Sequence, residues 1–192
     1  MVAQVPERDV VSAFTAALEE LNCLVLRADA EAAADTLIAF LQERRIAEVV
    51  AWSDAEFPGL PLGAAARAAG IAWHAALPGT DPARYREEAA RAGAGVTGVA
   101  WAIAETGTLV LMSGPGRPRS ASLLPPVHIA VVRREQILGS MTELFSRLGR
   151  LASTGGLSAA VNLVTGASRT ADIEHVLVRK VHGPGEVAVL LV

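Results

Sequence analysis

Short apolar runs alternate with amphipathic stretches of helical spacing through the first half of this 192-residue chain. Residues 7–21 carry apolar side chains at helical spacing, and residues 24–26 form a short apolar run that suits a strand. A second helix follows, with Asp29 as its expected cap and an apolar stripe through Leu37 and Leu41. Strands that alternate with helices predict an α/β fold, with a mostly parallel sheet and helices on both faces.

The same alternation continues to the end of the chain, with one irregular stretch. Asp81 and Pro82 are typical of a helix start, because aspartate caps the first turn and proline fits within it. Residues 96–112 form a long apolar run broken by polar residues 105–108, which predicts two strands joined by a turn. The four prolines of residues 113–126 predict a long loop. The remaining expected strands are residues 48–52, 71–77, 127–132, 159–164 and 187–192, and the remaining expected helices are residues 63–69, 82–92, 141–148 and 170–178.

The composition limits the compartment and the partners. We expect an N-terminal helical segment over residues 1–22 and one α/β domain over residues 23–192. The net charge of -3 provides no basic field for nucleic acid, and the single Cys23 excludes an iron–sulfur cluster held by this chain's own thiolates. No signal-peptide core opens the sequence, and no apolar run reaches the about 18 residues that span a bilayer. A cytoplasmic protein without a membrane segment is expected.

The first motif with chemical potential is the polar group between the two strands expected in residues 96–112. Glu105 and Thr106 stand at the tip, and Gly107 would let a ligand or another backbone approach closely. A carboxylate there could act as a general base, a nucleophile or a hydrogen-bond anchor. It could equally be a turn residue that accepts backbone N–H bonds or pairs with an arginine.

The second motif lies at residues 165–174, where a strand leads through small residues into an expected helix. The hydroxyls of Ser168 and Thr170, the Arg169 guanidinium and free helix N–H groups suit a phosphate or carboxylate. In the alternative interpretation Ser168 or Thr170 only caps the helix, and Asp172 favours its positive end.

Two further motifs are weaker. His182 precedes a Gly-Pro-Gly turn and could move protons near neutral pH, although a histidine beside a turn is more often structural. Arg117 and Arg119 lie in the proline-rich loop, where they could close over an anionic substrate or remain solvated. The four histidines show no metal-ligand spacing, so no metal site is predicted.

These segments together resemble the signature of the bacterial lactate-utilisation protein C family, which has the LUD domain. The matching segments, in the family's order, are residues 98–109 (GVAWAIAETGTL), 122–129 (SLLPPVHI), 168–174 (SRTADIE) and 182–184 (HGP). Ala167 and Lys180 depart from the residues that the family often has at those turns. The resemblance implies a Rossmann-like fold of the superfamily that contains glucosamine-phosphate deaminase, ribose-phosphate isomerase and CoA transferases.

The resemblance also implies a role in oxidising L-lactate to pyruvate beside the iron–sulfur lactate-utilisation proteins A and B. This chain would bind no cofactor itself, and the iron–sulfur clusters would lie in the partners. Glu105 and His182 are the candidate catalytic residues. The candidate residues for binding a small carboxylate or phosphorylated ligand are Thr106, Gly107, Ser168, Arg169, Thr170 and Asp172.

Two other functions stay open at this point. A free-standing enzyme, either an acyl-CoA transferase or hydrolase or a sugar-phosphate isomerase, would use Glu105 as nucleophile or base and Arg169 as anion clamp. A sensing module would bind a small carboxylate without chemistry. All three hypotheses need the second-half motifs to meet at one place.

Overall fold

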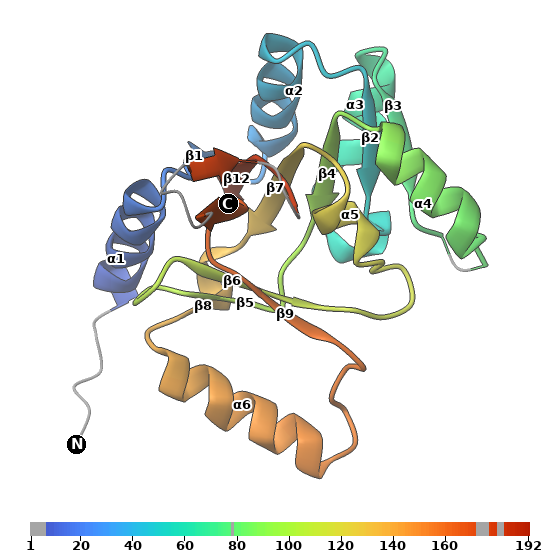
Figure 1. Cartoon of the computed structure of the whole chain (residues 1–192). Coiled ribbons are helices and arrows are strands. Elements are labelled where there is room, and N and C mark those ends of the chain that lie inside the picture. The colour runs from blue at the N-terminus through green and yellow to red at the C-terminus, as the bar shows by residue number, and fades with distance from the viewer. Residues whose placement is uncertain (1–6, 78, 172–176, 180–182) are drawn as a thin grey trace.

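The main sheet has six parallel strands (Figure 1). The chain passes from one edge of the sheet to the other and then returns, strand by strand, toward the first edge. The computed structural model describes residues 7–77, 79–171, 177–179 and 183–192. In spatial order the strands are β1 (Leu24–Arg27), β12 (Glu186–Leu191), β7 (Val127–Val132), β4 (Ala94–Thr97), β2 (Glu48–Ala51) and β3 (Ala72–Ala75). The predicted α/β fold with a mostly parallel sheet is confirmed.

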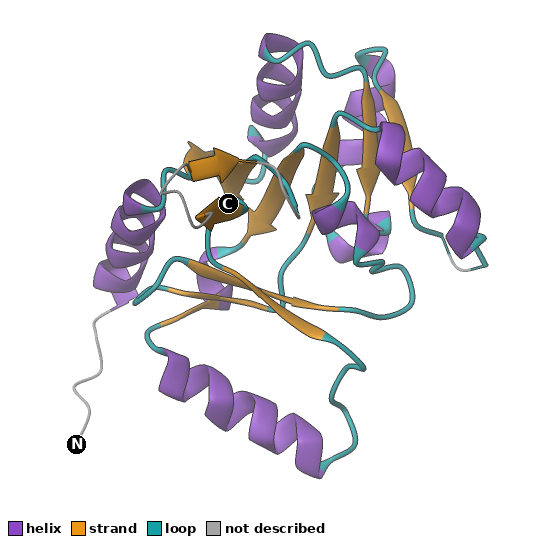
Figure 2. Ribbon diagram, viewed as in Figure 1, coloured by secondary structure: helices purple, strands orange, loops and turns teal. Residues whose placement is uncertain are grey.

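Helices cover both faces of this sheet (Figure 2). From β1 the chain steps outward through α2 (Ala33–Glu43) and α3 (Leu62–Ala68), which contact each other on one face. It then returns through α4 (Pro82–Arg91) and α5 (Ser120–Leu123), which contact each other on the opposite face. Right-handed crossovers explain the division, because reversing the direction of travel moves the connecting helix to the other face.

The start of α4 confirms the sequence interpretation of its cap. The Asp81 carboxylate accepts the N–H of Ala83 at 2.9 Å, and Pro82 occupies the first turn. The first helix, α1 (Glu7–Glu20), inserts Phe14 and Leu18 into the main core, where both are buried. Within the described residues, no helix combines the length and the hydropathy that a membrane crossing requires.

The stretch from Ala94 to Met112 holds three strands, where the sequence predicted two. Its first strand, β4, lies in the main sheet with every residue buried. The other two, β5 (Trp101–Ile103) and β6 (Thr108–Met112), pair antiparallel around the Glu105 turn, as predicted. A continuous apolar run cannot show where a buried strand leaves one sheet for another, so the run alone could not separate β4.

A second sheet, which was not predicted from the sequence, forms below the first (Figure 1). Its order is β8 (Ile137–Leu138), β5, β6 and β9 (Val161–Val164). Two short 3-10 helices, η1 (Asp54–Glu56) and η2 (Arg134–Gln136), follow β2 and β7. The helix α6 (Met141–Ser153) packs against β5 and β8 and starts at Ser140, whose hydroxyl accepts the N–H of Glu143 at 3.3 Å.

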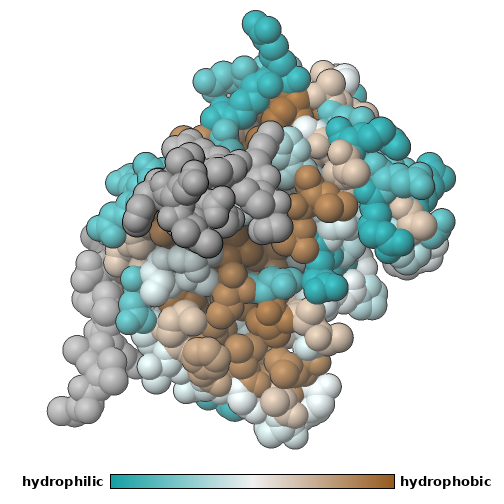
Figure 3. Space-filling view, in the orientation of Figure 1, coloured by the Kyte–Doolittle hydropathy of each residue, from teal (hydrophilic) through white to brown (hydrophobic). Residues whose placement is uncertain are grey.

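Beneath α6 the core is small. Ile103, Val110, Leu138 and Leu144 form a buried cluster separate from the main core. Phe145 of α6 stays 59% exposed and Leu163 of β9 44% exposed. Apolar side chains accordingly gather on the lower half of the visible face (Figure 3).

The helix predicted for residues 170–178 is wrong. Instead, β10 (Arg169–Ala171) pairs antiparallel with β11 (Leu177–Arg179), in a register that sets Thr170 opposite Val178. Branched residues such as these favour extended backbone over helix, which agrees with the observed pairing. The proline-rich loop also differs from its prediction, because its last part forms the single turn of α5.

Candidate functional site

A cavity opens at the carboxyl ends of the strands, beside the point where the chain reverses direction. The connections from β2 and β4 leave toward opposite sides of the sheet, and such a crevice is where open α/β sheets bind ligands. Residues 113–119 lie over this edge. The N–H of Ser53 donates to the carbonyl of Gly116 at 2.8 Å, and the Trp52 indole donates to the carbonyl of Pro118 at 3.2 Å.

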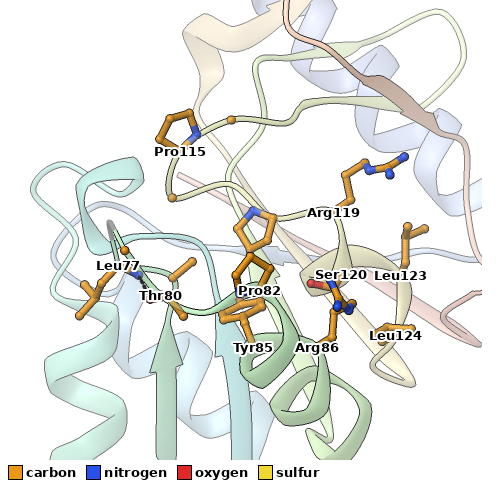
Figure 4. Close-up of a pocket in the computed structure, with 15 residues that line it drawn as sticks. Leu77, Thr80, Pro82, Tyr85, Arg86, Pro115, Arg119, Ser120, Leu123 and Leu124 are labelled. Atoms are coloured by element: carbon orange, nitrogen blue, oxygen red, sulfur yellow. Dashed lines mark hydrogen bonds between the residues drawn. The ribbon is translucent and has the colours of Figure 1, made fainter.

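The cavity has a volume of about 600 Å³, within the usual range of small-molecule sites. One wall comes from the end of β3 and the start of α4, and the other from residues 114–120 and α5 (Figure 4). Its lining residues are Ala76, Leu77, Gly79, Thr80, Pro82, Tyr85, Arg86, Gly114, Pro115, Gly116, Pro118, Arg119, Ser120, Leu123 and Leu124.

Arg86 is the charged group best placed in this cavity. It points from α4 toward α5, which begins at Ser120, whereas Arg119 extends away from α4 at the rim (Figure 4). Neither guanidinium has a carboxylate at ion-pairing distance among the described residues. Both are therefore available to an external anion.

Two other polar side chains line the cavity with different roles. The Thr80 hydroxyl accepts the N–H of Leu77 at 3.0 Å, so its own proton remains available to a ligand. Tyr85 is buried and donates to the carbonyl of Ala51 at 2.7 Å. Burial raises the pKa of Tyr85 far above its usual range, and the neighbouring Glu88 raises it further. Tyr85 therefore stays neutral and forms an aromatic wall.

Leucines surround the cavity on both sides. Leu77 is 60% exposed, and Leu123 and Leu124 of the α5 region are also exposed. Exposed apolar side chains next to an unpaired guanidinium suit a ligand that has one anionic end and an apolar body.

The predicted residue Glu105 lies away from this cavity. Its carboxylate accepts the N–H of Met141 at 3.0 Å, at the first residue of α6, and the side chain is exposed. A carboxylate at that position satisfies a free helix N–H and complements the positive end of the helix. This contact corresponds to the structural alternative weighed for the motif.

Replacing Glu105 with Gln should therefore have a small effect on stability. The amide oxygen can still accept the Met141 N–H, but the charge facing the helix start is lost. We expect a loss of about 0.5 kcal/mol in the free energy of unfolding, measured by urea denaturation. A loss above about 2 kcal/mol would contradict this role for Glu105.

The first and second motifs meet through threonines. The hydroxyl oxygens of Thr106 and Thr108 lie 2.7 Å apart, and those of Thr108 and Thr165 lie 2.8 Å apart. The turn glycines also converge, because Gly107 and Gly166 both have positive φ and both pack against Leu21 at the end of α1.

The remaining predicted residues are only partly described. The N–H of Ser168 donates to the carbonyl of Pro184 at 2.9 Å, so the second motif touches the turn after His182. Arg169 and Thr170 belong to β10, and no helix starts there to offer free N–H groups. Asp172 and His182 lie outside the described residues.

Sequence reasoning missed most of the cavity. Of the four motifs, as far as the structure describes them, only the proline-rich loop with Arg119 lines the cavity. Thr80 belonged to no motif, Ser120 lay in the proline-rich loop without an assigned role, and Arg86 is one of three arginines on a charged helix. The signal that could have found Arg86 is its position in the second turn of a helix that follows a strand, near the edge where ligands bind. No group of metal-binding side chains clusters in the described part of the chain.

Comparison with known proteins identifies the family to which this chain is similar. The family model of the LUD domain matches residues 11–192. The chain is 35% identical over 137 residues to "Lactate utilization protein C" of Shouchella clausii, and 34% identical over 146 residues to the protein of that name from Halalkalibacterium halodurans. These matches cover 71% and 75% of this chain, but 58% and 62% of the relatives, so the chain spans about three fifths of their length.

A solved structure has the same fold. The crystal structure of a DUF162 family protein from Deinococcus radiodurans matches with a TM-score of 0.65 at 20% identity, over 98% of this chain and 99% of that one. At that identity the likeness concerns the fold alone. The family model covers the whole parallel sheet, the second sheet and both turn motifs, and the chain therefore belongs to the LUD domain family.

Proposed function

We propose that this protein takes part in lactate utilisation by binding L-lactate or pyruvate in the cavity between α4 and α5. The observation that carries the proposal is Arg86, a guanidinium without an acidic partner among the described residues, which points across a cavity at the carboxyl edge of the sheet. The names of the curated relatives support the substrate class. A guanidinium binds a carboxylate through two parallel N–H bonds, which also fixes its orientation.

The polar groups around Arg86 suit a hydroxy acid or keto acid. The carboxylate would pair with Arg86, and the hydroxyl protons of Thr80 and Ser120 would donate to the second oxygen function of the ligand. Lactate has only six heavy atoms, so it would occupy a small part of a cavity of about 600 Å³. The unfilled volume and the exposed leucines leave room for a partner protein at the mouth.

Oxidising L-lactate to pyruvate removes two electrons and two protons, and these electrons need an acceptor. With a single cysteine, this chain cannot hold an iron–sulfur cluster through its own thiolates. We therefore propose that the iron–sulfur lactate-utilisation proteins A and B carry the electrons, while this chain positions the carboxylate in the cytoplasm.

Replacing Arg86 with Gln should weaken the binding of L-lactate and pyruvate at least about tenfold, because it removes a charge-assisted hydrogen-bond pair. Isothermal titration of each acid against the whole chain measures the change. Arg84→Gln is the matched control on the same helix, since Arg84 is 77% exposed, pairs with Glu88 and does not line the cavity. Neutral lactamide should bind weakly to every variant.

Two results would contradict the proposal. One is that neither acid binds saturably to the parent protein, and the other is that Arg84→Gln and Arg86→Gln lose affinity equally. The role in lactate utilisation needs a separate test in cells. Deleting the gene should impair growth on L-lactate, and affinity capture of the whole chain should recover cysteine-rich partners. Intact growth together with no such partner would reject that role.

A further inference from the structure

Three arginines lie at the carboxyl ends of the strands, as the first cavity does, but toward the β1 side of the sheet, whereas the first cavity lies toward the β3 side. Arg27 is the last residue of β1 and pairs in register with Leu191 of β12, which pairs with Val132, the last residue of β7. Arg133 and Arg134 follow Val132 directly. The register therefore brings the three guanidinium-bearing residues to the ends of two strands, β1 and β7, which flank β12.

These arginines line a second cavity of about 530 Å³. Its lining residues are Val11, Arg27, Ala28, Asp29, Ala30, Arg133, Arg134, Leu191 and Val192. Asp29 is the one acidic side chain among them, and its Oδ1 already accepts the N–H of Ala32 at 2.8 Å. Three arginines against one aspartate make this wall cationic in a chain whose net charge is -3.

The arginines differ in how firmly they are held. The Arg133 guanidinium donates to the carbonyl of Pro58, and its backbone N–H donates to the Gln136 side chain at 2.8 Å. Arg27 and Arg134 are exposed. Within the described residues, none of the three has a carboxylate at ion-pairing distance. The Arg133 guanidinium is held at Pro58, and the exposed guanidinium groups of Arg27 and Arg134 can close around an anion at the cavity.

The start of α2 adds to this positive potential. The cavity borders Ala28, Asp29 and Ala30, and α2 begins at Ala33, directly after the Ala32 N–H that the Asp29 carboxylate accepts. The positive end of the helix dipole therefore lies near the arginines. It supplements them and would be too weak a feature alone.

We propose that this second cavity binds a phosphate-bearing small molecule. A phosphate group offers several anionic oxygens, which two or three guanidinium groups can share through paired N–H bonds, whereas one carboxylate needs a single guanidinium. The volume of about 530 Å³ exceeds that of a phosphate ion, so the site has room for the organic part of the molecule. This site is distinct from the Arg86 cavity and does not depend on lactate binding there.

Pyrophosphate is the probe for this site, titrated calorimetrically into the whole chain at constant ionic strength. The parent protein should bind it saturably. The double variant Arg27→Gln, Arg134→Gln should bind it at least about tenfold more weakly, because two charge-assisted contacts are lost. Arg150→Gln, an exposed arginine of α6 that lines neither cavity, should bind it like the parent.

A second readout locates the bound anion. Backbone amide NMR signals of Ala28 and Ala30 should shift with pyrophosphate, and thermal unfolding without ligand should show that the double variant folds. The proposal is overturned if the parent does not saturate, if the double variant binds like the parent, or if Arg150→Gln loses as much affinity. It is equally overturned if the shifts gather around Arg86 instead. Lactate binding to the double variant reports separately on the first cavity.

Discussion

Replacing Gly95 with alanine should be the most damaging single-methyl change in this protein. Gly95 lies in β4 at the centre of the main sheet, and a Cβ there would stand 1.7 Å from the carbonyl oxygen of Ala121 in α5. Two atoms at that distance overlap, and both neighbours are packed, so either α5 or the strand must move. We expect a loss of at least about 3 kcal/mol in the free energy of unfolding, at the upper end for overpacking.

The same change should also reach the first cavity, because α5 carries Ser120. If α5 moves outward, the affinity for pyruvate should fall together with stability. Gly139→Ala is the control, since a Cβ at Gly139 meets no atom within 4 Å. Urea denaturation at neutral pH compares the two variants. A loss below about 1 kcal/mol in Gly95→Ala would show that α5 is not held against β4.

His128 should make the protein lose stability as the pH falls below neutrality. The ring is fully buried in β7, and its Nε2 lies 2.9 Å from the hydroxyl of Thr97, whereas its Nδ1 has no hydrogen-bond partner among the residues that the structure describes. Burial lowers the pKa of His128 from 6.5 to about 4. In the unfolded chain the ring takes up a proton near pH 6.5, whereas the folded protein resists doing so until about pH 4.

The sign of the effect follows from this difference. Below pH 6.5 the unfolded state binds more protons than the folded state, so the free energy of unfolding decreases as the pH falls toward about 4. Between pH 7.5 and pH 5.0 the loss should be about 2 kcal/mol, at 1.36 kcal/mol per pH unit below the unfolded pKa.

His128→Gln provides the test, because the amide keeps a hydrogen-bonding group near Thr97 and does not titrate. Denaturation curves for both proteins at pH 7.5 and pH 5.0 give the two differences. The difference should be smaller by about 2 kcal/mol in the variant. Equal differences would mean that His128 accepts a proton in the folded state.

Local signals in the sequence predicted the elements that local chemistry decides. Asp81 and Pro82 predicted the start of α4, and the polar residues at Glu105 predicted the turn between β5 and β6. The segment around Thr170 was predicted as a helix because it follows a turn of small residues, but the partner of Thr170 is Val178 in β11, eight residues along the chain. A hairpin depends on that partner, which helical periodicity cannot reveal.

The cavity could not be predicted for a related reason. Arg86 becomes significant only because α4 and α5 meet on one face, and that meeting depends on the direction of each crossover. The sequence favoured Glu105 over Arg86 as a functional residue because Glu105 is an isolated carboxylate at a turn. In the structure, however, this carboxylate accepts the N–H of Met141 at the start of α6. An isolated charged residue in the sequence is therefore not necessarily free to bind a ligand in the folded protein.

The reversal of chain direction between β2 and β4 has a thermodynamic consequence. The walls of the first cavity come from the segment after β3 and the segment before β7, and the strands that position these walls come from nearly the whole length of the chain, so the site forms only when the main sheet is assembled. Ligand binding and global folding are then linked, because the anion would bind only the folded protein and would therefore stabilise it against unfolding. Any sequence change that raises the unfolded fraction would weaken the apparent affinity, even where it lies far from Arg86.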